Sequence, residues 1–299
     1  LRVDKLFPQG KQHILDLTSS SQRGRDRRGY LEKAQLQLPT TIEEEIIGLE
    51  WMAQFGWQRN DPFVCLIVRD SKYLDTTFPG SNWSYHSYRD SDISTYIKAI
   101  EYLTSQGIFV FRMGREVSTR LEIQNPRFID YANRSDKSDF LDVWLFARCK
   151  LCVTTGTGPD MISDVFRRPI LAVNFLPLNC LWTWSNAMHF PKILRWSETG
   201  RMLNLTEYLN ANFLGTEYYA REGITITDLD ENQILNCIKE SIAQVNGTYE
   251  ESQFEVELNR EFWRIVRTHP VVESYSPYIH PQSRLSPSFF AYAGESFLR

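Results

Sequence analysis

Three absences narrow the class of protein to which this 299-residue chain belongs. No apolar run approaches the ~20 residues of a membrane-spanning helix, and the first residues given do not show the pattern of a signal peptide, so we expect a cytoplasmic protein, free or peripheral at a membrane. The 33 Lys and Arg residues are outnumbered by 37 Asp and Glu residues, which argues against binding of nucleic acid. An anionic ligand must therefore be met by a local cluster of arginines.

Cysteine is scarce, and nothing in its pattern indicates a disulfide framework or a metal site. The five cysteines are odd in number and mostly lie in apolar runs, as reduced core residues do. Cys149 and Cys152 form a CxxC pair, but no second Cys/His pair follows at zinc-like spacing. Asp139 and Asp142 are better explained as the first turn of a helix than as metal ligands. We expect no metal and no cofactor apart from the substrate.

Aromatic residues are plentiful at 13%, including 8 Trp and 14 Tyr. We expect most of them in the core of an ordinary globular protein, since 42% of the residues are hydrophobic and 23% are charged. The alternative is a carbohydrate cleft in which rings stack on sugar faces.

Strand and helix patterns alternate along the chain. A helix over 40–56 is capped by Thr40 or Thr41, and the apolar run PFVCLIVRD after it is typical of a strand buried on both faces. Further strands are predicted at 108–111, 127–131, 151–154 and 170–175, and helices at 91–106, 138–147 and 161–166. This alternation predicts an α/β fold with a doubly wound, mostly parallel sheet.

The ends of the chain are less regular. Residues 1–38 are polar and indicate a loosely organised lead-in, and residues 181–196 predict loops around one further strand. Helices follow at 231–245 and 250–268, with a terminal element at 287–298. We divide the chain into a lead-in and helix (1–58), a nucleotide-binding domain (59–246) and a C-terminal helical segment (247–299) that packs back on the sheet or cleft.

The segment KLCVTTGTGPDMISDVFRRP, residues 150–169, is the most informative part of the chain. A strand, a small-residue turn and a helix follow one another, so backbone N–H groups at the helix start would be free to bind phosphate. The turn is neither a Walker loop nor a GxGxxG fingerprint, and a tight turn of any α/β protein is the alternative. The predicted phosphate-binding residues of this loop are Thr154, Thr155, Gly156, Thr157 and Gly158.

Arginines follow two other strands at the point where each ends. Arg69 follows the first strand, and Arg112 and Arg115 flank Gly114 after the second. Carboxyl ends of parallel strands meet at one edge of a sheet, where ligands of such folds bind. We therefore predict diphosphate contacts from Arg69, Arg112 and the close turn at Gly114, with Arg89 as a further contact. The alternatives are an ion pair of Arg69 with Asp70 or a neighbour, and a surface salt bridge of Arg89.

Three residues are candidates for a catalytic base. Asp70 lies at the end of the first strand, His86 lies in the loop before the next helix, and Asp160 lies in the first turn after the glycine loop. Each has a plainer explanation: Asp70 holds Arg69, His86 is solvated, and Asp160 interacts with the helix dipole. A base in a preceding domain is a further alternative.

Three sequence blocks carry a resemblance to a known family. VCLIVRDSKYL with YHSYRDSDISTYIKAIEYLTSQGIFVFRMG, DFLDVWLFARCKLCVTTGTGPDMISDVFRRPILAVNFLPL, and SRLSPSFF near the end together resemble bacterial GT-B glycosyltransferases of surface-polysaccharide gene clusters. The likeness covers residues 63–178 and the tail near 284–290. The arginine after the first strand is more distantly similar to the fucosyltransferase group.

The resemblance implies a Rossmann-like, nucleotide-sugar-binding half of a GT-B enzyme with extra C-terminal helices. It implies a metal-independent transfer of sugar from a nucleotide sugar to a carbohydrate acceptor, free or lipid-linked. About 58 residues upstream are too few for a complete acceptor domain, and the chain begins with Leu1 rather than Met, so we expect a fragment or a chain with an incomplete acceptor side. The alternatives are a nucleotide-sugar epimerase of the same architecture, a non-catalytic binding module and, more weakly, a methyltransferase.

Overall fold

A seven-stranded sheet forms the centre of the computed structural model, which describes residues 25–36, 38–270 and 278–299. The strand order is β3-β2-β1-β4-β5-β6-β9, and every neighbouring pair is parallel. This is the order of a doubly wound, Rossmann-like sheet with one strand added at an edge, so the predicted α/β class is confirmed. The strands are β1 Phe63–Ile67, β2 Phe109–Met113, β3 Phe128–Ile129, β4 Leu151–Thr154, β5 Ile170–Val173, β6 Ala187–Phe190 and β9 Arg284–Leu285.

The two central strands are buried on both faces. All residues of β1 and β4 are buried, and Val64 of β1 lies opposite Leu151 of β4. A continuous apolar run is what such a position requires, because neither face of the strand meets water. The predicted strands at both places are confirmed.

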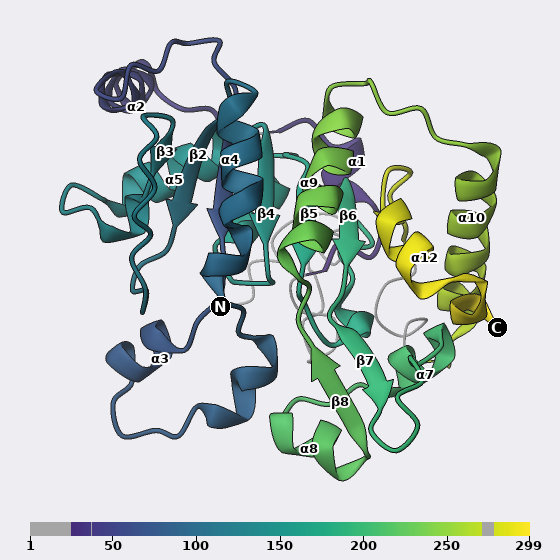
Figure 1. The fold of residues 1–299 in the computed structure, drawn as a ribbon. Helices are drawn as coiled ribbons and strands as arrows, with labels where there is room; N and C mark the ends of the chain where they lie inside the picture. The colour runs from purple at the N-terminus through teal and green to yellow at the C-terminus, as the bar shows by residue number, and fades with distance from the viewer. Residues whose placement is uncertain (1–24, 37, 271–277) are drawn as a thin grey trace, which may run out of the picture.

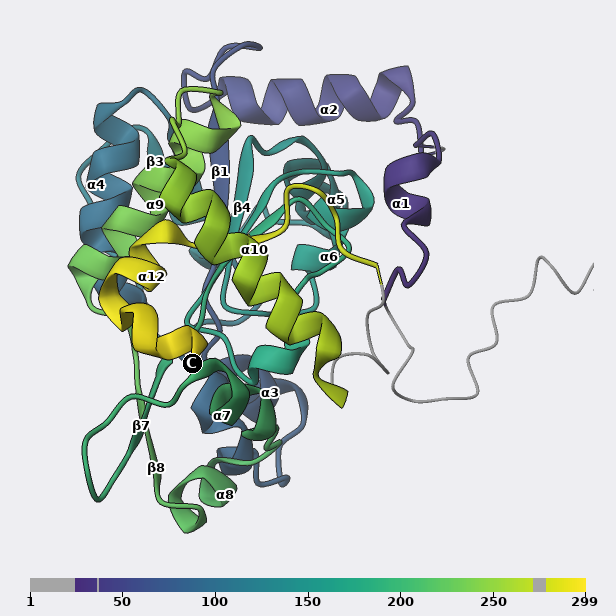
Figure 2. The same ribbon diagram turned by 90° about the vertical axis from the view of Figure 1, so that its right-hand side faces the viewer.

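Helices cover both faces of the sheet. Figures 1 and 2 show α4 (Ile97–Ser105) and α9 (Glu231–Val245) on one face, with α5 (Asp139–Arg148) and α6 (Asp160–Val165) on the other. The predicted helix at 91–106 begins as a 3₁₀ turn, η5 (Ile93–Tyr96). None of the described helices has the length and apolarity needed to cross a membrane.

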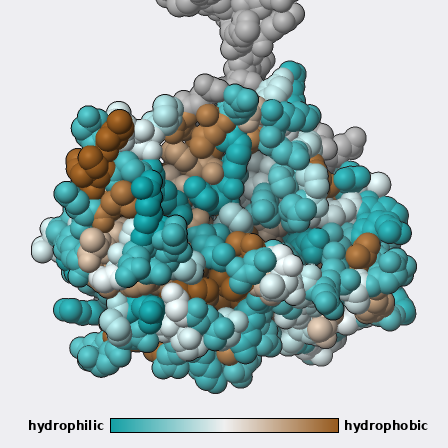
Figure 3. Space-filling model, turned by 90° about the horizontal axis from the view of Figure 1, so that it is seen from above, coloured by the Kyte–Doolittle hydropathy of each residue, from teal (hydrophilic) through white to brown (hydrophobic). Residues whose placement is uncertain are grey.

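Helix α2 (Ile42–Ala53) lies at the edge of the sheet where the strands begin (Figure 1). Thr41 caps it: its hydroxyl accepts from Glu44 N at 3.2 Å and its own N–H donates to the Glu44 carboxylate at 2.8 Å. Gly48 fits against the ring of Trp144 on α5, where a Cβ would clash. Seen from above, the surface is mostly hydrophilic with separate hydrophobic patches (Figure 3).

Most of the 1–38 lead-in lies outside the described residues. Its described part contains one short helix, α1 (Tyr30–Lys33). Two hydrogen bonds fasten this helix to the sheet domain, from the Arg167 guanidinium to the carbonyls of Leu31 and Ala34 at 2.6 and 2.8 Å.

The prediction of one further strand within 181–196 was wrong, because two strands lie there. Strand β6 joins the main sheet, while β7 (Ile193–Trp196) pairs antiparallel with β8 (Ile224–Thr227) in a separate sheet. Only Pro191 and Lys192 separate β6 from β7, so the two patterns merge in the sequence. The short elements α7 (Leu205–Asn210), α8 (Thr216–Arg221), β8 and β9 were not predicted.

The C-terminal helices pack beside the β6 edge of the sheet (Figure 1). They comprise α10 (Gln253–Thr268), α12 (Pro287–Ala293) and the 3₁₀ turn η8 (Glu295–Leu298). The Phe289 ring lies 5.3 Å from the ring of Phe190 on β6, and Trp263 Nε1 donates to Ser283 O at 2.9 Å. These contacts place the C-terminal segment against the sheet.

The five cysteines are free, and all except the partly buried Cys180 are buried. Within the described residues, no group of three His, Cys, Asp or Glu side chains is placed to hold a metal ion.

Candidate functional site

The strand order of the sheet reverses between β1 and β4. Successive strands run outward on either side of this point, so the crevice beyond the carboxyl ends of β1 and β4 is where ligands of open α/β sheets bind. Arg69 and Asp70 follow β1 there, and the 155–158 turn follows β4. Figure 1 shows the excursion that carries α3 (Lys72–Thr77), and the β7–β8 pair with α8, below these strand ends.

The turn after β4 is held by its own side chains. Thr154 Oγ1 donates to Asp160 Oδ2 at 2.7 Å and accepts from Gly156 N at 3.0 Å, and Thr157 N donates to the same carboxylate oxygen at 2.7 Å. The expectation of free N–H groups at Gly156 and Thr157 was therefore wrong, because side-chain oxygens already accept from them. Gly156 adopts a φ of +85°, which favours glycine.

Asp160 is fully buried beneath this turn. Burial raises the pKa of its carboxyl to about 6, against the lowering effect of its hydrogen bonds from Thr154 and Thr157. A general base must come within hydrogen-bond reach of the substrate. The geometry therefore gives Asp160 the role of fastening the turn.

Arg69 lies beside the same turn. Its N–H donates to Thr155 Oγ1 at 2.8 Å, and its Nε lies 3.3 Å from Asp90 Oδ1. The carboxylate near Arg69 is thus Asp90 rather than Asp70, and in the described part of the chain no hydrogen bond occupies the two terminal nitrogens. Burial and then the nearby Arg89 charge lower the pKa of Arg69.

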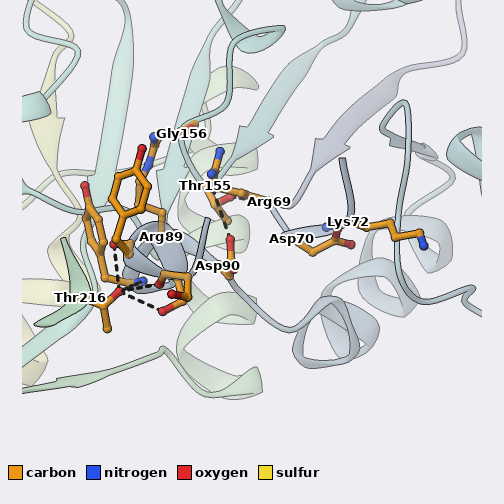
Figure 4. A network of polar contacts seen from close by, with 12 residues as sticks. Arg69, Asp70, Lys72, Arg89, Asp90, Thr155, Gly156 and Thr216 are labelled. Atoms are coloured by element: carbon orange, nitrogen blue, oxygen red, sulfur yellow. Dashed lines mark hydrogen bonds and ion pairs between the residues drawn. The ribbon is translucent and has the colours of Figure 1, made fainter. Parts of the chain in front are cut away.

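Arg89 reaches the turn from the 3₁₀ helix η4 (Ser84–Arg89). Its Nη2 donates to Gly156 O at 2.6 Å (Figure 4). Thr216 at the start of α8 secures η4, since its Oγ1 accepts from Tyr88 N at 2.9 Å. The surface salt bridge considered for Arg89 is not present among the described residues, and Arg89 and Arg69 meet at one turn.

His86 lies one 3₁₀ turn before Arg89, so the two side chains share a face of η4. Burial lowers the pKa of His86, and the charges of Arg69 and Arg89 lower it further. Its buried Nδ1 has no partner in the described part of the chain. We call Arg69, His86 and Arg89 the cationic cluster, because each side chain is or can become a cation at this one place.

A cavity of about 390 Å³ opens beside Arg69. Its walls come from the ends of β1 and β2, from the turn after β4, from α3 and from α5. Asp142 of α5 contributes a carboxyl whose pKa is raised by burial. The predicted site residues in its lining are Arg69, Asp70, Gly114, Thr157 and Gly158.

Asp70 organises the loops around this cavity. Its Oδ1 accepts from Lys72 N at 2.9 Å, and its Oδ2 accepts from Ser118 N at 3.0 Å and from Ser118 Oγ at 3.1 Å. These bonds join the start of α3 to the loop after β2. Gly114 lies in that loop with a φ of +151°, and an added Cβ would lie 2.9 Å from the Val117 side chain.

Arg112 is not brought into the cationic cluster. Its side chain is only 3% exposed, and its Nη1 bonds to Thr119 O and lies 3.4 Å from Asp130 Oδ2. A phosphate contact would require breaking these buried bonds. Its neighbour Arg115 is exposed and lines the cavity, 3.5 Å from Asp139.

Sequence reasoning missed Asp90, Thr216 and Lys192. Lys192 is buried, and its Nζ donates to Asp90 O and to Asp228 Oδ1, the latter at 2.6 Å. Asp90 follows Arg89 directly, which is the one local signal that was present. Thr216 and Lys192 are more than 100 residues from the groups they secure, so no local pattern indicated them.

Fold and site together define a Rossmann-like α/β protein with a cationic cluster and a cavity at the reversal point of its sheet. Comparisons of the chain with family models, curated proteins and solved structures found no match.

Proposed function

We propose that the chain is a glycosyltransferase that transfers sugar from a nucleotide sugar to a carbohydrate acceptor. The observation that carries the proposal is that Arg69 and Arg89 both bond to the turn after β4, with His86 near enough for both charges to lower its pKa. Arg69 also lines a cavity of about 390 Å³. Only Asp90 forms an ion pair with this cluster among the described residues. An anion with several oxygens would supply the missing negative charge and hydrogen-bond acceptors.

A diphosphate fits this arrangement. Guanidinium groups bind phosphate oxygens in pairs and keep their charge at all relevant pH values. When the bond from the sugar to the diphosphate breaks, negative charge grows on the leaving oxygen, and Arg69 and Arg89 would stabilise it. The resemblance of residues 63–178 to the donor-binding half of GT-B enzymes is consistent with this role.

His86 is the base that the geometry favours among the three candidates. Asp70 is held in internal hydrogen bonds and Asp160 is fully buried beneath the turn, whereas the side chain of His86 is only partly buried. Burial and the neighbouring arginines keep its pKa below the ordinary value of 6.5. The ring is thus neutral at pH 7 and able to accept the proton of an acceptor hydroxyl.

Thermal unfolding with a panel of GDP-, UDP-, CMP- and dTDP-sugars tests the proposal. We expect one nucleotide class to stabilise the chain by about 2.7 kcal/mol at 100 times its Kd, which is roughly 5 °C for a protein of this size. Arg69→Ala and Arg89→Ala should each lose most of this response. Arg148→Ala, at the opposite edge of the sheet, is the matched control. A panel without any shift, or a shift kept in both variants, would contradict the proposal.

A non-catalytic binding module is the second candidate. The observation in its favour is that two of the three candidate bases, Asp70 and Asp160, are used to hold loops. Release of nucleoside diphosphate separates the possibilities. Release that needs a carbohydrate acceptor identifies a transferase, release from the donor alone indicates an epimerase, and binding without release identifies a binding module.

A further inference from the structure

The excursion between β1 and η5 carries exposed aromatic side chains beside the cationic cluster. Tyr73 is 40% exposed, Phe78 50% and Tyr85 39%. Large rings are normally placed in the core because their burial stabilises the fold. Here they lie on the excursion between β1 and η5, which extends below the carboxyl ends of the strands in Figure 1.

The rings form a connected series that ends at the cationic cluster. The Trp83 ring lies 5.9 Å from Phe78 and 6.2 Å from Tyr85. It is also 6.2 Å from the ring of His86 and nearly parallel to it, at 11°. The centroids of Tyr85 and His86 are 3.9 Å apart. We call Phe78, Trp83, Tyr85 and His86 the aromatic ledge.

Hydrogen bonds hold the ledge in place. Trp83 Nε1 donates to Phe78 O at 3.4 Å, and Ser84 N donates to Asn82 Oδ1 at 3.0 Å. On the other side, Thr216 Oγ1 donates to Tyr85 O at 3.1 Å and so connects the ledge to α8. These bonds hold the Trp83 ring and the backbone of the ledge in place before any ligand arrives, which reduces the ordering cost of binding.

We propose that the aromatic ledge is the acceptor subsite and binds a pyranose ring of a carbohydrate chain. This inference rests on the proposed function, since it places the acceptor next to the donor diphosphate. The C–H faces of a pyranose pack on aromatic rings, while its hydroxyls stay free for hydrogen bonds. A sugar on Trp83 and Tyr85 would present a hydroxyl toward His86.

The position of His86 supplies the proton acceptor that the transfer needs. The acceptor oxygen forms a bond to the anomeric carbon of the donor, and its proton passes to the neutral imidazole of His86. The bond between the anomeric carbon and the diphosphate oxygen breaks, and the electron pair leaves with the diphosphate. Arg69 and Arg89 hold that leaving group.

Charge argues for a carbohydrate rather than a membrane surface. Aromatic anchors of membrane-associated proteins are usually accompanied by clustered lysines and arginines that meet anionic lipids. In the 71–90 excursion, Lys72 and Arg89 are balanced by Asp75 and Asp90. Both arginines near the ledge are also committed to the site, Arg89 to Gly156 O and Arg69 to Asp90.

Oligosaccharide binding to the full chain tests the ledge. The probes are maltoheptaose, cellohexaose and chitohexaose, each added with the nucleoside diphosphate that stabilises the chain, and the readout is saturation-transfer NMR with titration of tryptophan fluorescence. We expect at least one probe to bind, with affinity at least 10-fold weaker in Trp83→Ala and Tyr85→Ala. Trp83→Phe should recover binding because it keeps a ring. Phe254→Ala, which removes an exposed ring from α10, should have no effect.

The outcomes separate this proposal from the proposed function. The thermal shift by nucleoside diphosphate must survive in Trp83→Ala and Tyr85→Ala, which also shows that both variants fold. A nucleotide response without binding of any of the three oligosaccharides would overturn the ledge alone. Unchanged affinity in both alanine variants would do the same, as would ledge-dependent binding to phosphatidylglycerol vesicles. No nucleotide response at all would overturn the proposed function.

Discussion

The two edges of the sheet each carry a cavity with arginines, and they use those arginines differently. The cavity at the amino edge is the larger, about 460 Å³, against about 390 Å³ at the carboxyl edge. Its lining contains Arg59, Arg148, Lys150, Arg168, Trp57 and Trp144. By size and by number of cations, the amino edge would be the better candidate for an anion site.

The contacts of two of these four cations favour a structural role at the amino edge. At the amino edge, Arg148 bonds to Glu45 and stacks on Trp144 with a 4.7 Å separation, and Arg168 Nε donates to Ala147 O at 2.7 Å. Arg148 thus fastens α5 to α2, and Arg168 fastens the segment after α6 to α5. At the carboxyl edge, Arg69 and Arg89 lie close enough for the charge of Arg89 to lower the pKa of Arg69. A cation held near another cation indicates a place for an anionic ligand more reliably than a count of cations does.

The largest expected effect compares one arginine from each edge. Arg112→Met removes the partner of Asp130 in a pair whose side chains are 3% and 12% exposed, so we expect a loss of about 3 kcal/mol in the free energy of unfolding. Arg148→Met breaks a pair that is 20% and 30% exposed, and the expected loss is below about 1 kcal/mol. Urea denaturation measures both. Equal losses would show that Arg112 is not the structural residue described above.

The next effect in size concerns the buried carboxyl under the turn. Because the pKa of Asp160 in the folded chain is about 6 and its ordinary value is 3.8, the folded state holds an extra proton between about pH 4 and 6. The free energy of unfolding should therefore fall as the pH rises through this window, by up to about 3 kcal/mol, and stay level above it. In Asp160→Asn, the free energy of unfolding should not show this fall. Denaturation curves between pH 4 and 7 would detect the difference. A wild-type curve parallel to that of the variant would contradict the assignment.

The sequence predicted the sheet and one edge of it well, since both depend on local pattern. The apolar runs of β1 and β4 and the small-residue turn after β4 identified the reversal point, and Arg69 follows β1 by position alone. The sequence did not predict contacts between residues that are far apart in the chain. Nothing near residue 69 indicates pairing with Asp90, and nothing near residue 88 indicates Thr216.

Side-chain hydrogen bonds also changed the expected role of one element that was predicted in the right place. The turn at 154–158 exists as predicted, yet the hydroxyl of Thr154 and the carboxylate of Asp160 occupy two N–H groups that the pattern left free. Binding then depends more on side-chain cations than on backbone amides. The hydrogen bonds that cause this difference depend on the conformation of the folded turn, which the periodicity of the sequence does not predict.

A smaller effect is expected from one glycine at each edge. Gly156 and Gly56 both have positive φ, +85° and +73°, so alanine costs about 1 kcal/mol at either position. An added Cβ at Gly156 would also lie 3.3 Å from the Trp182 ring, whereas nothing lies within 4 Å at Gly56. Gly156→Ala should therefore be the more destabilised in thermal unfolding, and it alone should weaken the nucleotide-sugar response. A response weakened equally by Gly56→Ala would remove the distinction between the edges.

The smallest expected effect is the one that decides between the two cavities. Lys150 lines the amino-edge cavity and follows α5, so Lys150→Ala removes a positive charge there without touching the cationic cluster. Stability should change by less than about 0.5 kcal/mol, and the thermal shift by the effective nucleotide sugar should equal that of the wild type. Arg69→Ala removes one charge of the same sign at the carboxyl edge and should lose most of the shift. If Lys150→Ala loses the response and Arg69→Ala keeps it, the ligand binds at the amino edge, and cavity volume rather than the close approach of two arginines is the better guide to the binding site.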